Sequence, residues 1–180
     1  MRPRTGAILL LILGVPAFGY GGPHVRCVNP PVPRQLSSAL VTRVVDGDTI
    51  DVVPNRNRVS VRLIGIDAPE VHWGSRLDRQ AQSIGVSSRV MQNLGHQSSE
   101  FARRYLDGRE IRLELDVQHR DSFGRLLAYV WLRDSRLFNM IILREGYAQV
   151  YTFPPNVKYV DLFLACEREA REKGRGLWRR

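Results

Sequence analysis

Apolar and polar residues alternate along several short segments of this chain. Such alternation is typical of half-buried β-strands. It predicts five strands: Ala39–Val45, Thr49–Val53, Arg58–Ile66, and the segments REIRLELDV (109–117) and RLLAYVWL (125–132). An Asp46-Gly47 pair joins the first two strands, and both residue types tolerate the positive φ of tight turns. The pattern therefore predicts a β-hairpin around residue 47.

Other segments repeat apolar residues at helical spacing. Val90, Leu94, Phe101 and Tyr105 recur at intervals of four, seven and four within a mostly polar region. This spacing suits one face of a single helix, or of two joined helices interrupted near Gly95. Two further helical segments follow, at 137–145 and 160–173.

The order of these elements predicts the fold class. Three strands, a helical region, two more strands and further helices indicate an α+β, mainly β protein, because hairpins dominate and crossovers are few. A small five-stranded OB-like barrel with about three helices fits this order better than a parallel sheet.

The N-terminal residues have a different composition from the rest. Two arginines precede an apolar run at 7–15, and small residues follow, which is the pattern of a secretory signal peptide over residues 1–19. The run is shorter than the roughly 20 residues that a membrane-spanning helix needs, although a membrane anchor is the alternative. Residues 20–37 carry several prolines and predict an extended segment, and residues 38–180 form the globular domain. We expect a secreted or periplasmic protein without stable membrane association once the signal is removed.

The chain has two cysteines, Cys27 and Cys166. Export would place them in an oxidising compartment, where a structural disulfide between the extended segment and the C-terminal helix is expected. The alternative is a pair of free, buried thiols.

Basic residues outnumber acidic residues 27 to 18, and all but two of them are arginines. A polyanionic partner is a natural match, because the planar guanidinium contacts phosphate with two donors at once. Genome base composition could produce the same bias, so charge alone names no partner.

Three carboxylates follow or begin predicted strands. Asp48 shares parity with the inward-facing Ile50 and is expected at the barrel rim, where an inward side chain still meets water. Asp67 and Glu70 leave the barrel together, where Pro69 ends the strand. Gathered carboxylates and freed backbone carbonyls are the ligands that Ca²⁺ prefers. Taken alone, DAPE could be an ordinary acidic turn, and Arg62 an outward-facing strand residue.

Five motifs, in order along the chain, resemble the staphylococcal nuclease (thermonuclease) family: DGDT (46–49), RLIGIDAPE (62–70), DSFGRLLAYV (121–130), REGYAQV (144–150) and GLW (176–178). The resemblance covers roughly residues 38–178. It implies that residues 38–180 are a nuclease domain.

The resemblance also implies roles for particular residues. Asp48, Asp67 and the backbone carbonyl of Ala68 would bind Ca²⁺. Glu70 would act as the base or would position the attacking water. Arginines 62 and 125 would grip the scissile phosphate, so Arg62, Glu70 and Arg125 form the expected catalytic set.

Nucleotide contacts are expected from three aromatic residues. Phe123 stands where the family prototype has a tyrosine, which removes a hydroxyl that could contact phosphate. Tyr151 and Phe153 lie near the family's base-stacking tyrosines, and stacking tolerates any base. The alternative for the latter two rings is packing beneath the last helix.

These observations predict a secreted, Ca²⁺-dependent nuclease that hydrolyses DNA, with RNA as a second candidate substrate, and acts as a monomer. One alternative is a catalytically silent OB-like module that binds single-stranded nucleic acid. Another is an exported interaction domain for a different polyanion. Arg62, Glu70 and Arg125 together favour the enzyme, because a pure binding module needs no glutamate beside a phosphate.

Overall fold

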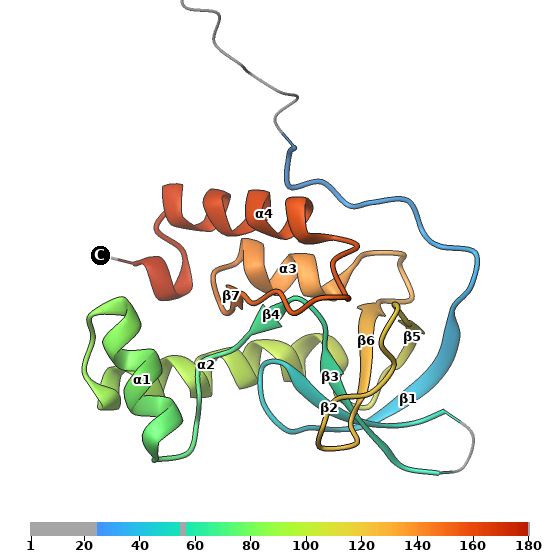
Figure 1. Ribbon diagram of the computed structural model, residues 1–180, viewed down its shortest axis with the longest axis horizontal. Coiled ribbons are helices and arrows are strands. Elements are labelled where there is room, and N and C mark those ends of the chain that lie inside the picture. The colour runs from blue at the N-terminus through green and yellow to red at the C-terminus, as the bar shows by residue number, and fades with distance from the viewer. Residues whose placement is uncertain (1–24, 55–56, 180) are drawn as a thin grey trace, which may run out of the picture.

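The computed structural model describes residues 25–54 and 57–179, and Figure 1 shows the arrangement of their helices and strands. The expected signal peptide at 1–19 lies outside the described residues. Five strands close into a barrel in the order β1-β2-β3-β6-β5. Their bounds are β1 (Ser37–Val44), β2 (Thr49–Val53), β3 (Val59–Leu63), β5 (Glu110–Glu114) and β6 (Leu126–Trp131). The predicted α+β class and five-stranded barrel are confirmed.

The predicted strand from Arg58 to Ile66 is wrong as a single element. β3 ends at Leu63, and a separate short strand, β4 (Ile66–Asp67), pairs antiparallel with β7 (Gln149–Val150). Gly65 between them has φ +80°, a left-handed conformation that cannot continue a strand. The break turns Asp67 away from the barrel ladder and toward the helices.

Four α-helices lie within the described ranges: α1 (Ser75–Ile84), α2 (Ser88–Leu106), α3 (Phe138–Arg144) and α4 (Val160–Glu172). A short 3₁₀ helix, η1 (Gly176–Trp178), follows them. Figure 1 shows α3 and α4 side by side, and α1 beside α2. Among the described residues, none of the helices combines the length and the apolar character needed to cross a bilayer.

Of the two alternatives for the region from Val90 to Tyr105, the single helix is confirmed, because α2 runs through Gly95 without interruption. The helical region is instead divided at Gly85, whose left-handed conformation ends α1. Gly95 is required by packing: a Cβ there would stand 2.5 Å from the backbone oxygen of Glu70. α2 therefore lies directly against the segment that follows β4.

The barrel core confirms the alternation along the strands. Val61 and Leu63 of β3 are buried, whereas the alternating residues Ser60 and Arg62 are only partly buried. The buried Glu114, at the end of β5, accepts hydrogen bonds from Trp131 Nε1 (2.7 Å) and from the Tyr159 hydroxyl. Lys158 also pairs with this carboxylate. These partners satisfy a carboxylate that would otherwise be costly to bury.

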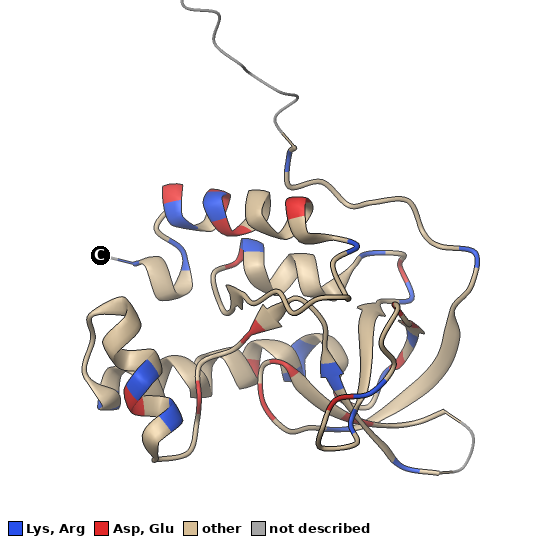
Figure 2. Ribbon diagram, in the orientation of Figure 1, with Lys and Arg blue, Asp and Glu red and all other residues tan. Residues whose placement is uncertain are grey.

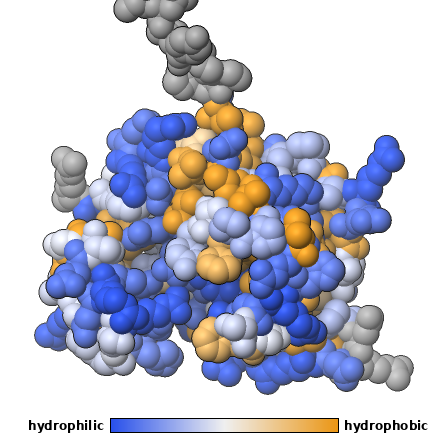
Figure 3. Space-filling model, viewed as in Figure 1, coloured by the Kyte–Doolittle hydropathy of each residue, from blue (hydrophilic) through white to orange (hydrophobic). Residues whose placement is uncertain are grey.

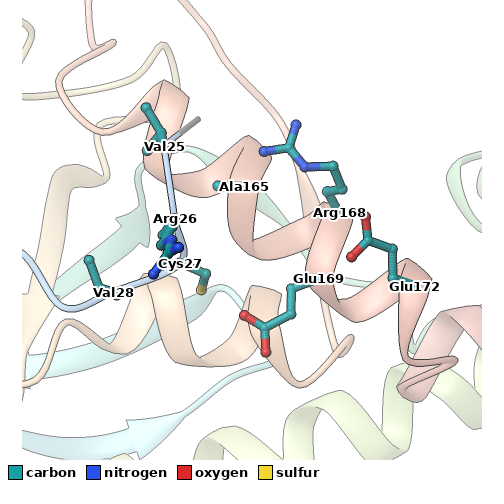
Figure 4. Close-up of a pocket in the computed structure, with 8 residues that line it drawn as sticks. All are labelled: Val25, Arg26, Cys27, Val28, Ala165, Arg168, Glu169 and Glu172. Carbon is teal, nitrogen blue, oxygen red and sulfur yellow. The ribbon is translucent and has the colours of Figure 1, made fainter. Parts of the chain in front are cut away.

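A disulfide bond joins Cys27 to Cys166 across 139 positions of sequence and ties the N-terminal segment to α4. A shallow pocket beside it is lined by this segment and one face of α4 (Figure 4). Figure 3 shows hydrophobic residues gathered near the N-terminal segment, and Val25 and Val28, which line the pocket, are exposed. The pocket shares no lining residue with the expected catalytic or metal-binding sets.

Candidate active site

Arg62 lies between the two aspartates expected to bind metal. Its Nη2 is 3.2 Å from Asp48 Oδ2 and 3.2 Å from Asp67 Oδ1. Its Nη1 donates to the backbone oxygens of Leu63 (2.9 Å) and Ile66 (2.7 Å). The side chain is only 11% exposed, so Arg62 does not face outward into solvent. One guanidinium therefore ties the ends of β3 and β4 to the start of β2.

Asp48 is more enclosed than its predicted rim position implies. It is 3% exposed, and the expectation that its side chain meets water is wrong. Oδ2 accepts the N–H of Ala68 (2.7 Å), and Oδ1 accepts the Thr49 hydroxyl (3.0 Å). The Ala68 segment and α2 cover the barrel end, which explains the burial.

The connection between β1 and β2 also differs from the predicted tight turn. Gly47 does not adopt a positive φ. Glycine is required here because there is no room for a side chain: a Cβ at this position would stand 2.0 Å from Ser98 Oγ of α2. Asp46 Oδ1 accepts the N–H of Asp48 (3.0 Å). Burial, and then the charge of Asp48, raise the pKa of Asp46 to about 7, so this carboxyl group releases its proton less readily than an exposed aspartate does.

Glu70 is held by the backbone of the residues that follow it. Its Oε1 accepts the N–H groups of Val71 (3.0 Å) and His72 (3.3 Å). Its Oε2 lies 3.6 Å from Arg76 Nε on α1. Asp48, Asp67 and Glu70, here called the acidic cluster, thus lie around the ends of β3 and β4. Figure 2 shows acidic residues on β4 and on the connection to α1, with basic residues on β3 and α1.

Two residues of α1, which belong to none of the five motifs, also enter the site. Arg76 Nη2 lies 2.8 Å from Asp67 Oδ1. Gln80 Nε2 donates to Asp67 Oδ2 (2.8 Å) and to the Ala68 carbonyl (3.1 Å), and Gln80 Oε1 accepts the N–H of Glu70 (2.7 Å). Their four-residue spacing on a helix just after Glu70 was the available signal, since it places both on one face.

The surroundings of Arg76 show how acidic this region is. Partial burial would lower the pKa of Arg76, but the charges of Asp67, Asp48 and Glu70 outweigh it and raise the pKa. Arg76 therefore pairs with Asp67 and Glu70, and the charge of Asp48 acts on it as well. Its side chain is half exposed, so it reaches the cluster from the solvent side.

The donor set fits a hard divalent cation. Asp48 and Asp67 supply carboxylate oxygens, and Ala68 supplies a carbonyl oxygen. The guanidinium groups of Arg62 and Arg76 provide positive charge beside these carboxylates. Calcium takes such oxygen ligands from carboxylates, carbonyls and water. Three or more His, Cys, Asp or Glu side chains do not converge as a metal cluster anywhere in the described ranges. A cation here would therefore rely on two aspartates, the carbonyl and water.

Arg125 is held apart from these contacts, at the turn before β6. Its Nε donates to Asp121 Oδ2 (2.7 Å), and its N–H donates to Asp121 Oδ1 (2.9 Å). β6 runs parallel to β3, with Leu127 opposite Arg62. Arg125 thus begins the strand next to the one that carries Arg62, with its remaining guanidinium donors partly open to solvent.

The three expected aromatic residues are exposed. Phe123 is 83% exposed and lies 5.5 Å from the guanidinium carbon of Arg125. Tyr151 and Phe153 are also exposed, so the alternative that they pack beneath the last helix is wrong. The N–H of Tyr151 donates to the Gly65 carbonyl (3.1 Å), which places Tyr151 beside the break between β3 and β4.

Comparison with known proteins assigns the chain to a family. Residues 60–180 match the staphylococcal nuclease homologue model. The chain is 38% identical to the thermonuclease of Staphylococcus intermedius over 187 aligned positions, which cover all of both proteins. It is 34% identical to the thermonuclease of Staphylococcus hyicus, covering 77% of this chain and 73% of that protein. Endonuclease YncB of Bacillus subtilis is 31% identical, covering 81% of this chain and 63% of that protein.

The chain belongs to the staphylococcal nuclease homologue family. The predicted family is confirmed. In this staphylococcal nuclease homologue the family match begins within β3 and includes Arg62, Asp67, Glu70 and Arg125. Asp48 precedes the matched range but lies within the full-length alignment to the S. intermedius thermonuclease.

Proposed function

We propose that this protein is a nuclease that hydrolyses phosphodiester bonds of DNA, and of RNA as a second substrate, with Ca²⁺ as its cofactor. Relatives named thermonuclease and endonuclease support the reaction class. The observation that carries the proposal is the partly buried Arg62, which lies between Asp48 and Asp67. The carboxylates that would bind the cation therefore lie next to the guanidinium that would bind the phosphate.

Asp48, Asp67 and the Ala68 carbonyl would hold the cation. Ca²⁺ matches this set because it is a hard ion that accepts carboxylate, carbonyl and water oxygens with flexible geometry. A bound cation of this kind polarises a phosphoryl oxygen and lowers the pKa of a bound water.

Arginines 62 and 125 would stabilise the phosphate. Negative charge grows on the phosphoryl oxygens as the bond breaks, so fixed cations in a partly dehydrated site lower the barrier. Arg62 is immobilised by two carbonyls and two carboxylates. Asp121 orients Arg125 from one side, which leaves the other side of the guanidinium for substrate oxygens.

Glu70 would orient or deprotonate the attacking water. Two backbone N–H groups fix Oε1 and therefore the plane of the carboxylate. Oε2 points toward Arg76 at the partly open side of the cluster. A carboxylate that is fixed on Oε1 and held on Oε2 only by a 3.6 Å ion pair is suited to hold a water in one direction.

The exposed rings of Phe123, Tyr151 and Phe153 would contact nucleotides. Stacking on an aromatic ring is worth about 1–3 kcal/mol per base and does not depend on base identity. This supports cleavage with little sequence specificity.

The domain would act outside the cytoplasm as a monomer, after removal of residues 1–19 and with residues 20–37 as an extended lead-in. The disulfide from Cys27 to Cys166 supports an oxidising compartment.

The decisive experiment incubates purified protein with plasmid DNA, or with RNA, in Ca²⁺ or in excess chelator. We expect cleavage only with Ca²⁺, and a loss of orders of magnitude in kcat for Glu70→Gln with little change in substrate affinity. The control is Glu172→Gln on α4, outside the site. Binding without cleavage under every condition would identify a catalytically silent nucleic-acid-binding module.

A further inference from the structure

The side chain of Gln80 on α1 forms hydrogen bonds with three residues of the site, Asp67, Ala68 and Glu70. Its amide nitrogen bonds Asp67 Oδ2 and the Ala68 carbonyl, and its amide oxygen bonds the N–H of Glu70. We propose that Gln80 is a positioning residue, which sets the geometry of two cation ligands, Asp67 and the Ala68 carbonyl, and of the glutamate that follows them. This inference rests on the proposed function.

The direction of the amide is decided by its partners. The N–H of Glu70 requires an acceptor, whereas Asp67 Oδ2 and the Ala68 oxygen require a donor. Only one orientation of the Gln80 amide meets both demands. The side chain is therefore matched to this site, and its contacts fix the direction of each partner.

These contacts leave the ligand atoms able to bind a cation. A carbonyl oxygen has two lone pairs and a carboxylate about four acceptor positions. One bond from Gln80 to each of them orients the group without using its full capacity. Partners of this kind raise cation affinity because the ligands are ordered before binding.

The support for Gln80 comes from a packed helix. Leu77 and Ala81, on either side of Gln80 in the helix, are buried against Met91 of α2. α2 in turn packs against the Glu70 backbone at Gly95. Figure 1 shows α1 and α2 beside each other. The same two helices thus support both Gln80 and the segment that it holds.

The first test compares two variants of the full chain, Gln80→Met and Gln82→Met. Gln82 is exposed on the same helix, so this pair matches the chemical change without the contacts. We expect Gln80→Met to lower the Ca²⁺ affinity, measured by calorimetry without nucleic acid, by about 10–100-fold. We expect it to lower kcat by about 10–100-fold as well, with a smaller change in KM. Gln82→Met should match the wild type. Equal cation affinity and kcat in both variants would overturn the role of Gln80.

A second measurement needs no variant and so does not depend on the folding of one. In NMR spectra of the wild type, the side-chain amide resonances of Gln80 should shift during a Ca²⁺ titration, and those of Gln82 should stay in place. An unchanged Gln80 resonance at saturating Ca²⁺ would overturn the proposal. If the wild type binds Ca²⁺ and cleaves nucleic acid, but Gln80→Met has no effect and the Gln80 resonances do not shift, only the positioning role is refuted. A wild type that neither binds nor cleaves refutes the proposed function as well.

Discussion

Gly95 of α2 lies directly against the backbone carbonyl of Glu70, so close that a Cβ on residue 95 would stand 2.5 Å from that oxygen. The glycine brings a helix against the segment that carries the candidate base. Because residue 95 has no side chain, α2 can pack directly against the backbone of Glu70 and so helps to fix its position.

Gly95→Ala should destabilise the protein, although alanine is the better helix former by about 1 kcal/mol. Overpacking typically costs about 1–3 kcal/mol, and the backbone of Glu70 has to move. The free energy of unfolding in urea measures the effect, and Gln97→Ala at an exposed position of α2 is the control. A Gly95→Ala variant as stable and active as the wild type would show that α2 can shift away from Glu70 without loss of stability or activity.

Asp48→Asn should weaken Ca²⁺ binding sharply, because it removes a charge while preserving size. Cleavage should fall at low Ca²⁺ and recover in part at high Ca²⁺. Calorimetry and the Ca²⁺ dependence of the rate measure this, with the exposed Asp161→Asn of α4 as control. An unchanged Ca²⁺ dependence would place the cation elsewhere.

Arg76→Met should tighten Ca²⁺ binding in the absence of nucleic acid. Arg76 already supplies positive charge to Asp67 and Glu70, so an incoming cation competes with it. Arg79→Met, on the same helix and exposed, removes an equal charge without those ion pairs. If both variants change the affinity equally, the effect is long-range charge and not local competition.

Replacement of both cysteines by serine should lower the melting temperature and leave cleavage at moderate temperature nearly intact. Closing a loop of 139 residues restricts the unfolded chain, and the chain-entropy model assigns this about 4–5 kcal/mol. Differential scanning calorimetry measures the change, and reductant should affect the wild type but not the variant. Loss of cleavage at a temperature where the variant is folded would mean that the bond shapes the site.

Asp121→Asn should cost stability at neutral pH and little at strongly acidic pH. Partial burial would raise the pKa of Asp121, but hydrogen bonds from Arg125 and from the N–H of Phe123 outweigh it, so the pKa is lowered. A carboxyl with a depressed folded pKa stabilises the protein above its unfolded value, near 3.9, and loses that contribution as pH falls through the folded value. Urea unfolding of both proteins at several pH values tests this, and a difference that persists in strong acid would contradict it.

The sequence by itself predicted the barrel, because alternation along a strand is a local property that decides which residues of Val59–Leu63 face the core. It also determined the family, because Asp48, Arg62, Asp67 and Glu70 stand in motifs that can be read without coordinates. The break at Gly65 was missed, since the same residues also read as a continuous strand until β4 is seen to pair with β7.

Only the tertiary structure decided what surrounds those residues. The burial of Asp48, the crowding at Gly47 and the contacts of Gln80 all depend on how α1 and α2 pack against the end of the barrel. Helical periodicity shows which face of a helix is apolar, but it does not show where a polar residue beside that face will point. That direction follows from the packing of one helix on another, a relation between distant residues that no local pattern records.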